Sequence, residues 1–592
     1  MGTGFTIDTP IKIAQYGISS VISIVDDMLM EKIRAFYCNK TGRNYQKIGI
    51  KEEDARARRT TAYLNLVQEI VKENFEKLKA SSFNKGEEIV KYLEMLPENS
   101  PLKQAYKQML AAKDNDRVAK FQNWIRENLS VGDIDVNIMT KVDKSRYDKN
   151  GEALPSEHNM AHAVLRGFAK SDLESSVVLS AGFNRRLYGY LAKFEDFFPD
   201  KAGKLRKKIT IKVSDYRSAL TQSKFLAKKG LWVSEYRIES GLNCGGHAFA
   251  TQGYLLGPIL EEFARNRQEL AENTHKTYVQ ALQKLGKNVP PERLEQKLTV
   301  QGGIGNHSEQ EFLLNYYKVD ATGWGSPFLL APDVTSVDDE TMDLLSKAKE
   351  DDLYLSGISP LGVPFNSLRG NTKDREKEEL IKAGNPGSPC PKTYLQSSTE
   401  YSKTPLCTAS SQYQKKKIED LDKLGLDDKK YKKEYDKIVE KACLCVGLAT
   451  SAELVNGLEP KWGDGVSICP GPNMAYYSDR LNLKAIVDHI YGRKNILNQL
   501  NRPNFFIKEL NLYLDYLKSL VADNKEANDE RQQKYLLQFR ENLNQGIEYY
   551  KNLFGRIVID PQYSKSRLIS ELGEASERLR SLFDNKMLVK TS

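Results

Sequence analysis

Apolar and polar residues along roughly the first 370 positions follow two alternating periods. Short β-branched runs, such as residues 19–26 and 207–215, alternate with stretches of helical period, such as residues 159–171. Further strands are predicted at residues 2–8, 134–142, 175–184, 231–240, 298–305 and 320–331. Strands that alternate with helices imply parallel βαβ units. About eight strands are what closure needs, so the pattern predicts an α/β fold, a (β/α)₈ TIM barrel.

Long helical patterns interrupt this series and follow it. Residues 27–128 are charged and amphipathic, and they are too many for one crossover helix, so we expect a helical insertion there. The regularity stops after Asp351, where residues 357–371 are loop-like and residues 415–441 predict a charged helical hairpin. An apolar stripe in the C-terminal helices must pack on something, most simply the barrel. The predicted division is 1–370 (barrel), 371–478 (cysteine-containing loops and helices) and 479–592 (helices).

Composition is that of an ordinary globular protein. The 592 residues are 40% hydrophobic and 28% charged, and no run of about 18 apolar residues predicts a membrane span. Basic residues (88) and acidic residues (79) are intermixed, so the net charge of +9 does not demand a nucleic-acid partner. The first residues lack the pattern of an export signal, and we expect a cytoplasmic protein.

Two glycine-bearing strand ends carry the clearest chemical signal. They lie at residues 300–305 and 323–330, about one βα unit apart. In a barrel these would be strands seven and eight, where phosphate groups commonly bind. Glycine lets backbone N–H groups approach a phosphate closely. We therefore expect a phosphate site, formed by Gly302, Gly303, Gly325 and Ser326.

The order of these motifs resembles a known family. Gly245, Gly246 and His247 follow a strand, and the two glycine turns come after them. This order is similar to that of nitronate monooxygenases (2-nitropropane dioxygenases) and of the related FMN-type enoyl-acyl-carrier-protein reductases. The resemblance covers about residues 1–370 and implies a flavoprotein oxidoreductase with bound FMN. The FMN contacts that it implies are Asn137, Gly182, Lys212, Gly245, Gly246, Gly302, Gly303, Gly325 and Ser326.

The resemblance also implies that His247 acts as acid or base on a small-molecule substrate stacked over the flavin. Asn243, Cys244 and Phe249 depart from the family pattern, so the reaction stays open. Nitronate oxidation with O₂ is the nearest named activity. The alternatives are an NAD(P)H-dependent enoyl-type reductase, a multi-centre flavin and iron–sulfur reductase, and a non-catalytic FMN-binding assembly module. A homo-oligomer is a further expectation.

Each of these side chains also has a simpler interpretation. His247 could only order its loop, and Lys212 could be a lysine that extends to solvent from a strand end rather than a cation beside the flavin. Cys244 could approach the flavin, but we favour a buried inert thiol.

Five cysteines fall in one C-terminal stretch. They are Cys390, Cys407, Cys443, Cys445 and Cys469, and Pro follows two of them directly. Thiolates in a reducing compartment suit an iron–sulfur cluster or a structural zinc ion. The compact Cys-x₂-Cys spacing is absent, so burial as small apolar residues is the alternative. Of the two kinds of metal site, we favour a four-iron, four-sulfur cluster.

Overall fold

The fold is built on a parallel sheet of seven strands. The computed structural model describes residues 4–140, 143–147, 150, 152–180, 182–243, 245–247, 252–498, 501–527 and 530–584. Each strand of the sheet pairs in parallel with the next along the chain. The strands are β1 (Ser20–Ser23), β2 (Ile134–Ile138), β3 (Ser175–Leu179), β4 (Lys207–Val213), β5 (Val233–Glu239), β6 (Lys297–Gln301) and β7 (Ala321–Gly323). The prediction of an α/β fold with parallel βαβ units is confirmed.

The strand predicted at residues 2–8 is wrong. Its described residues, 4–8, form turns that lead into α1 (Thr9–Ile13). The Phe5 carbonyl accepts a hydrogen bond from the Ser336 N–H at 2.8 Å. The Asp8 carboxylate accepts hydrogen bonds from the Tyr37 and Ser336 hydroxyls. These contacts engage polar groups of the segment away from the sheet. In the described ranges β1 and β7 do not pair, so the sheet is a curled half-barrel rather than a closed eight-stranded barrel.

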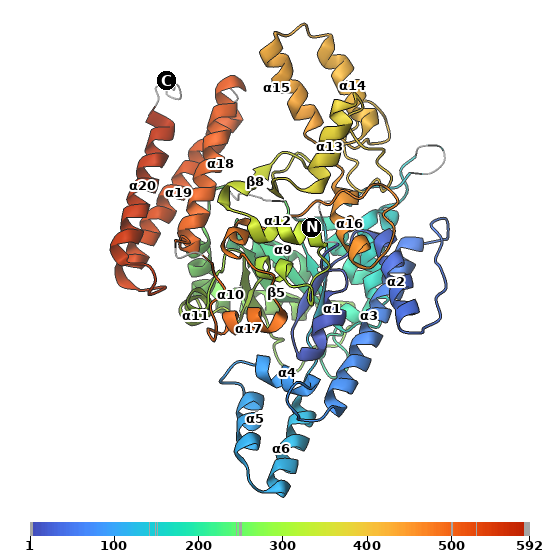
Figure 1. Cartoon of the computed structure of the whole chain (residues 1–592), viewed down its shortest axis with the longest axis vertical. Coiled ribbons are helices and arrows are strands. Elements are labelled where there is room, and N and C mark those ends of the chain that lie inside the picture. Colours follow the sequence, from blue (N-terminus) through green and yellow to red (C-terminus); the bar gives the residue numbers. More distant parts are fainter. Residues whose placement is uncertain are drawn as a thin grey trace.

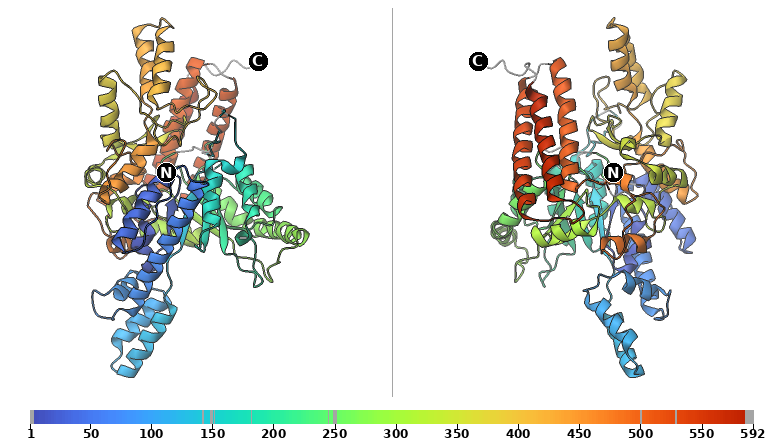
Figure 2. Two further views of the ribbon diagram at one scale, coloured as in Figure 1. Left: turned by 90° about the vertical axis from the view of Figure 1, so that its right-hand side faces the viewer. Right: turned by 60° about the vertical axis from the view of Figure 1, so that its left-hand side comes forward.

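Helices cover the sheet, and part of the predicted insertion is among them. The covering helices are α2 (Asp27–Lys40), α3 (Ala55–Ala80), α7 (Met160–Ala169), α8 (Arg185–Tyr190), α9 (Tyr216–Ala227), α10 (Leu256–Leu285) and α11 (His307–Tyr316). α3 lies so close to α7 that a side chain at Gly167 would meet the Ala57 carbonyl oxygen at 2.6 Å. The rest of the insertion is a projecting arm with its own apolar core (Figures 1 and 2). It consists of α4 (Glu88–Met95), α5 (Pro101–Ala111) and α6 (Asn115–Asn128).

The region after β7 contains a hairpin that the sequence pattern did not predict. β8 (Leu353–Ser356) and β9 (Phe365–Leu368) pair antiparallel, and all four residues of β9 are buried. Full burial removes the alternation that marks a half-buried strand. The other elements here are α12 (Asp339–Lys347), α13 (Thr372–Lys382), α14 (Ser411–Asp422), α15 (Asp428–Val439), α16 (Leu444–Val455) and α17 (Leu483–Ile490). The predicted charged hairpin is confirmed as α14 and α15, which project together (Figure 1).

Three long helices end the described chain. α18 (Phe505–Ala527), α19 (Glu530–Arg556) and α20 (Lys565–Asp584) lie side by side (Figures 1 and 2). Their buried apolar residues join the same core as the sheet and α10. Tyr550 on α19 accepts a hydrogen bond from the Gly257 N–H of α10 at 3.0 Å. The expected packing of the apolar stripe is therefore confirmed. None of the described helices has the length and apolar character needed to cross a membrane.

Candidate active site

The inner face of the sheet is polar, and its side chains form two layers. In β5, Tyr236 points towards α9, where its hydroxyl bonds with that of Ser223, so its neighbours Glu235 and Arg237 face the other way. In the lower layer, Arg237 donates to Glu235 at 2.8 Å and to Asp135 of β2 at 3.1 Å. Burial raises the pKa of Asp135 to about 6, even though Arg237 opposes the shift. Thus the lower layer is a charge network of one buried and two half-buried side chains.

The upper layer lies at the carboxyl ends of the strands and centres on Glu239. This carboxylate accepts from Lys212 Nζ at 2.9 Å, and from Asn243 Nδ2 and Gln301 Nε2 at 2.7 Å each. Lys212 and Glu239 are each 17% exposed, so the pair is reachable from solvent. The predicted Lys212 is therefore at the expected edge of the sheet, paired with a carboxylate that the motif comparison did not identify. The alternation Glu235, Arg237, Glu239 along β5 was the available sequence signal.

Asn137 lies on β2 at the same edge. Its Nδ2 donates to the Ser23 hydroxyl of β1 at 3.2 Å. Its Oδ1 is buried and has no hydrogen-bond partner in the part of the chain that the structure describes. A buried amide oxygen without a partner is costly, so this atom is a candidate contact for a ligand donor group.

The glycine turn after β6 is packed against the loop after β5. Gly302 has φ +101° and Gly303 has φ +81°, backbone conformations that L side chains rarely adopt. A Cβ at Gly302 would lie 2.9 Å from the Asn243 backbone nitrogen, and one at Gly303 would lie 2.7 Å from Leu242 Cδ1. Both glycines are thus required by the fold, whatever they bind. Gly302 is half-buried and Gly303 is buried.

The C-terminal region clamps this turn. Arg502 donates to the Gly303 carbonyl at 2.7 Å and forms an ion pair with Glu309 in which both side chains are at most 2% exposed. Glu309 in turn accepts from the Gly305 N–H at 2.8 Å. The sequence comparison missed Arg502, because nothing near it in the chain marks it as a partner of the glycine turn.

A second clamp holds the loop that carries His247. Glu509 of α18 accepts from the Ser240 hydroxyl at 2.7 Å, from the Gly241 N–H at 3.2 Å and from the Leu256 N–H at 2.8 Å. Burial raises the pKa of this carboxyl above its usual value. A helix some 250 residues away in sequence therefore fixes both ends of the loop.

His247 faces the β8–β9 hairpin. Its Nε2 lies 2.7 Å from the Ser359 hydroxyl, and its ring meets that of Phe365 edge-on at 5.2 Å. The preceding residue, Gly246, has φ +72° and accepts from the Asn366 N–H at 2.7 Å. The hairpin thus orients the imidazole. Cys244 and Phe249 lie outside the described residues.

The remaining predicted contacts lie at other strand ends. Gly182 follows β3 with φ +118°, and its carbonyl accepts from the Thr140 hydroxyl at 3.2 Å. Gly325 precedes a short 3-10 turn, η5 (Ser326–Leu330), and is half-buried. Ser326 is buried, and its hydroxyl donates to the Pro470 carbonyl at 2.8 Å. Because the hydroxyl proton is already donated to Pro470, Ser326 would contact a phosphate through its backbone N–H rather than through its side chain.

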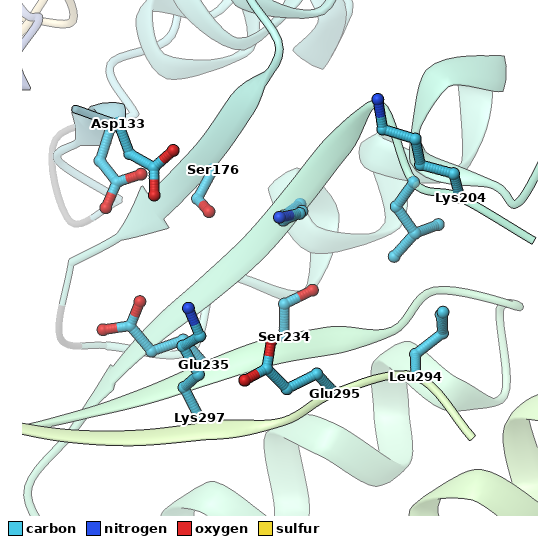
Figure 3. A pocket seen from close by; sticks show the side chains of 11 residues that line it. Asp133, Ser176, Lys204, Ser234, Glu235, Leu294, Glu295 and Lys297 are labelled. Carbon is cyan, nitrogen blue, oxygen red and sulfur yellow. The ribbon is translucent and has the colours of Figure 1, made fainter. Parts of the chain in front are cut away.

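The opposite edge of the sheet holds a cavity of about 230 Å³ (Figure 3). Its lining residues come from the amino ends of β2 to β6: Asp133, Asp135, Ser176, Lys204, Leu205, Lys208, Ser234, Glu235, Leu294, Glu295 and Lys297. Charges of both signs surround it, and none of the predicted flavin contacts lies there. The candidate active site is the carboxyl edge.

The predicted metal ligands lie in a separate buried cluster. Cys407, Cys443, Cys445 and Cys469 are buried and Cys390 is half-buried, and none of these five forms a disulfide. Within the described ranges, no group of three or more His, Cys, Asp or Glu side chains is arranged to hold one metal ion.

Comparisons with known proteins are sparse. No protein-family model matches the chain, and no curated protein matches it. Among solved structures, the chain is similar to the enoyl reductase domain of MlnA from the macrolactin biosynthesis cluster of Bacillus amyloliquefaciens, at 12% identity and a TM-score of 0.31. The match covers 67% of this chain and 86% of the other. A similarity this distant assigns neither a family nor an activity to the chain.

Proposed function

We propose that the protein is an FMN-dependent oxidoreductase whose flavin binds at the carboxyl edge of the sheet. One observation carries the proposal: Lys212 and its partner Glu239 lie at the strand ends, on the sheet edge that also holds Asn137 Oδ1, which has no hydrogen-bond partner among the described residues. Ligands of parallel α/β sheets bind outside the carboxyl ends of the strands. The residues present fit the ring of FMN, since the flavin N3–H is a donor for an orphaned amide oxygen.

The roles of the individual residues follow from their positions. Asn137 and Lys212 would contact the ring, and Gly302, Gly303 and Gly325 would lie towards the phosphate. FMN, when bound, supplies the capacity to accept or donate a hydride. Lys212 would provide positive charge beside the ring. Its ammonium donates to Glu239, and Asn243 and Gln301 hold that carboxylate in place. Gly182, Gly245 and Gly246 shape the surrounding loops.

His247 would exchange a proton with the substrate. Its Nε2 lies 2.7 Å from the Ser359 hydroxyl, and this contact orients the imidazole. Histidine side chains ordinarily titrate near neutrality, which suits proton transfer. The motif resemblance to nitronate monooxygenases favours oxidation of a nitronate as the activity, with O₂ as the final oxidant. An NAD(P)H-driven enoyl-type reduction would use the same residues, and the experiment below separates the two.

Flavin binding is the first test. The full chain is reconstituted with FMN, and binding is followed by quenching of flavin fluorescence. Lys212→Met is expected to weaken FMN binding roughly tenfold, which is about 1.4 kcal/mol. The matched control is Lys208→Met, on the same strand and the same face but at the opposite edge and exposed. Equal affinity of the two variants, or no binding by the wild type, would overturn the proposal.

The reaction is tested by anaerobic reduction of the bound flavin. Rapid bleaching by a nitronate and slow bleaching by NADPH supports nitronate oxidation, and the reverse order supports the reductase. His247→Gln is expected to slow the productive reduction by about 100-fold with FMN affinity unchanged, because general acid–base catalysis contributes on this scale. A flavoprotein that neither donor reduces would be a binding module instead.

A further inference from the structure

The helices that follow β3 and β4 carry basic residues without acidic ones. Neither α8 nor residues 216–230, which comprise α9 and the turn after it, contain Asp or Glu. Their basic residues are Arg185, Arg186, Arg217, Lys224, Lys228 and Lys229. In the chain as a whole, basic and acidic residues nearly balance, at 88 and 79, so these two helices depart from the general pattern.

α8 and α9 lie against each other, so their basic residues share one surface. The Tyr188 hydroxyl of α8 donates to Gln222 Oε1 of α9 at 2.8 Å. The ring of Phe183, just before α8, meets that of Phe225 on α9 edge-on at 5.1 Å. The surface that carries the six basic residues is called the α8–α9 surface below.

On α9 the basic side chains line one face of the helix. Arg217, Lys224 and Lys228 follow one another at intervals of seven and four residues, which is the spacing of one helical face, and all three are exposed. Ala219 and Leu226 are buried on the opposite face. Since a helix rises about 1.5 Å per residue, the three cations form a row of roughly 16 Å.

This positive charge is not compensated by neighbouring carboxylates. None of the six basic side chains forms an ion pair within the part of the chain that the structure describes. Asp215, the N-cap of α9, instead accepts from the Ser218 N–H at 2.6 Å. On α15, by contrast, Lys430, Lys432 and Lys437 each pair with a carboxylate three or four residues away. The α8–α9 surface is therefore available to an anionic partner.

The surface begins at the rim of the candidate active site. In parallel βα units the helices start near the carboxyl ends of the strands. Arg185 is the first residue of α8, and Arg217 lies in the first turn of α9, five residues after Lys212. A partner on the α8–α9 surface would lie beside the loops at the carboxyl edge.

The side chains between the cations favour a protein over other anionic partners. The large apolar side chains that are exposed in the described chain include none from residues 183–230, whereas helices that bind membrane surfaces insert such side chains. Phe183 and Phe225 are half-buried, with Arg185 over the first ring at 5.4 Å and Lys229 over the second at 5.3 Å. Cations therefore cover the rings on which the bases of a nucleic acid would stack.

We propose that the α8–α9 surface docks an acidic protein, which presents a row of Asp and Glu side chains along one of its helices. Complementary charge of this kind steers association and makes it sensitive to salt. The row of Arg217, Lys224 and Lys228 faces the carboxylates of the partner. None of the six basic residues is among the proposed flavin contacts, so the docking surface does not depend on FMN.

The first experiment measures binding of a model acidic helix to the full chain. The probe is a labelled, alanine-rich peptide of about 20 residues with glutamates along one helical face, and its control has glutamines there. Fluorescence anisotropy at low salt is expected to show roughly tenfold tighter binding of the glutamate peptide. This advantage is expected to shrink as salt is added, because salt screens exposed charges.

Two triple variants with the same loss of charge locate the binding. Arg217→Gln, Lys224→Gln and Lys228→Gln together are expected to weaken binding of the glutamate peptide roughly tenfold, since they remove the row of cations. The control changes three exposed lysines whose charge is already paired, and it is expected to alter binding less than about twofold. Its substitutions are Lys430→Gln, Lys432→Gln and Lys437→Gln.

Reversal of the charges distinguishes docking from a damaged fold. The chain with Arg217→Glu, Lys224→Glu and Lys228→Glu is expected to bind the matching lysine peptide instead, which a misfolded chain would not do. Equal binding of the glutamate and glutamine peptides by the wild type, or equal losses in the two glutamine variants, would overturn the proposal. So would tighter binding of single-stranded oligothymidylate or of phosphatidylglycerol vesicles than of the glutamate peptide. FMN titration of the same variants is expected to give the wild-type affinity, so failure of docking and failure of flavin binding are distinguishable.

Discussion

The two edges of the seven-stranded sheet carry similar polar side chains but are completed differently. At the carboxyl edge, Arg502 and Glu509 from the C-terminal region clamp the two loops that flank Glu239. At the amino edge, charged residues line a cavity (Figure 3). Asp135 is one of its lining residues. Polar strand residues alone therefore do not make a site. At the carboxyl edge, the C-terminal segments that carry Arg502 and Glu509 hold the loops in fixed positions.

The largest effect is expected from breaking the clamp at the carboxyl edge. Arg502→Met leaves Glu309 buried without its cation, and removing one partner of a buried ion pair costs about 3–5 kcal/mol. Urea unfolding measures the free energy, and FMN titration is expected to show weaker binding. The double variant with Glu309→Leu is expected to recover part of the loss. A cost below about 1 kcal/mol for Arg502→Met would show that the clamp does not hold this edge together.

The glycine turn at the same edge ranks second. Gly302→Ala forces a side chain into a left-handed conformation and against the Asn243 nitrogen, and we expect a loss of about 2–4 kcal/mol. Gly362→Ala is the matched control, because Gly362 has φ +68° with no atom within 4 Å of the added Cβ. It is expected to cost about 1–2 kcal/mol. Thermal unfolding compares the two, and equal losses would contradict the close packing of the loops after β5 and β6.

At the amino edge the expected effect depends on pH. Because burial raises the pKa of Asp135 to about 6, the folded state holds this proton more tightly than the unfolded chain does. The carboxyl therefore contributes stability below about pH 4 that is lost as the pH rises through about 6. Asp135→Asn lacks this dependence, so its free energy of unfolding is expected to gain up to about 3 kcal/mol relative to wild type between pH 4 and pH 7.

Urea titrations across this range check the pH prediction. Asp133→Asn is the control, because Asp133 lines the same cavity but is exposed. If both variants show the same pH profile as the wild type, Asp135 is not the group that titrates.

The smallest effect is expected from an exposed residue of the amino edge. Lys208→Met removes one charge from the cavity wall and is expected to change the free energy of unfolding by less than about 0.5 kcal/mol. FMN affinity should stay at the wild-type value. A loss of flavin binding in this variant would mean that the ligand occupies the amino edge, and the comparison between the edges would be reversed.

Much of the fold was predictable, and the exceptions have a physical cause. The seven strands appear where the sequence pattern predicts them, because the face of the sheet that packs against the helices selects apolar residues while the inner face keeps polar ones. The turn at residues 4–8 and the strand β9 were misjudged, since their state depends on contacts with Ser336 and His247 far along the chain. Neither contact produces a pattern in the nearby sequence from which the turn or the strand could be predicted.

The candidate site divides in the same way. Gly302, Gly303 and His247 could be selected from motifs, because tight turns demand glycine and proton transfer favours histidine. Glu239 was missed although its alternation with Glu235 and Arg237 was visible. Arg502 and Glu509 could not be found, since their partners are more than 190 residues away.

The sequence by itself determined the order of strands and helices and the glycine turns at their ends, because both follow from local backbone preferences and periodic burial. Only the tertiary structure decided that β7 and β1 stay unpaired in the described part of the chain, that Glu239 gathers three donors at one edge, and that cysteines from separate segments share one buried cluster. These outcomes depend on side chains that pack across long sequence separations, and no short-range pattern encodes which segments meet.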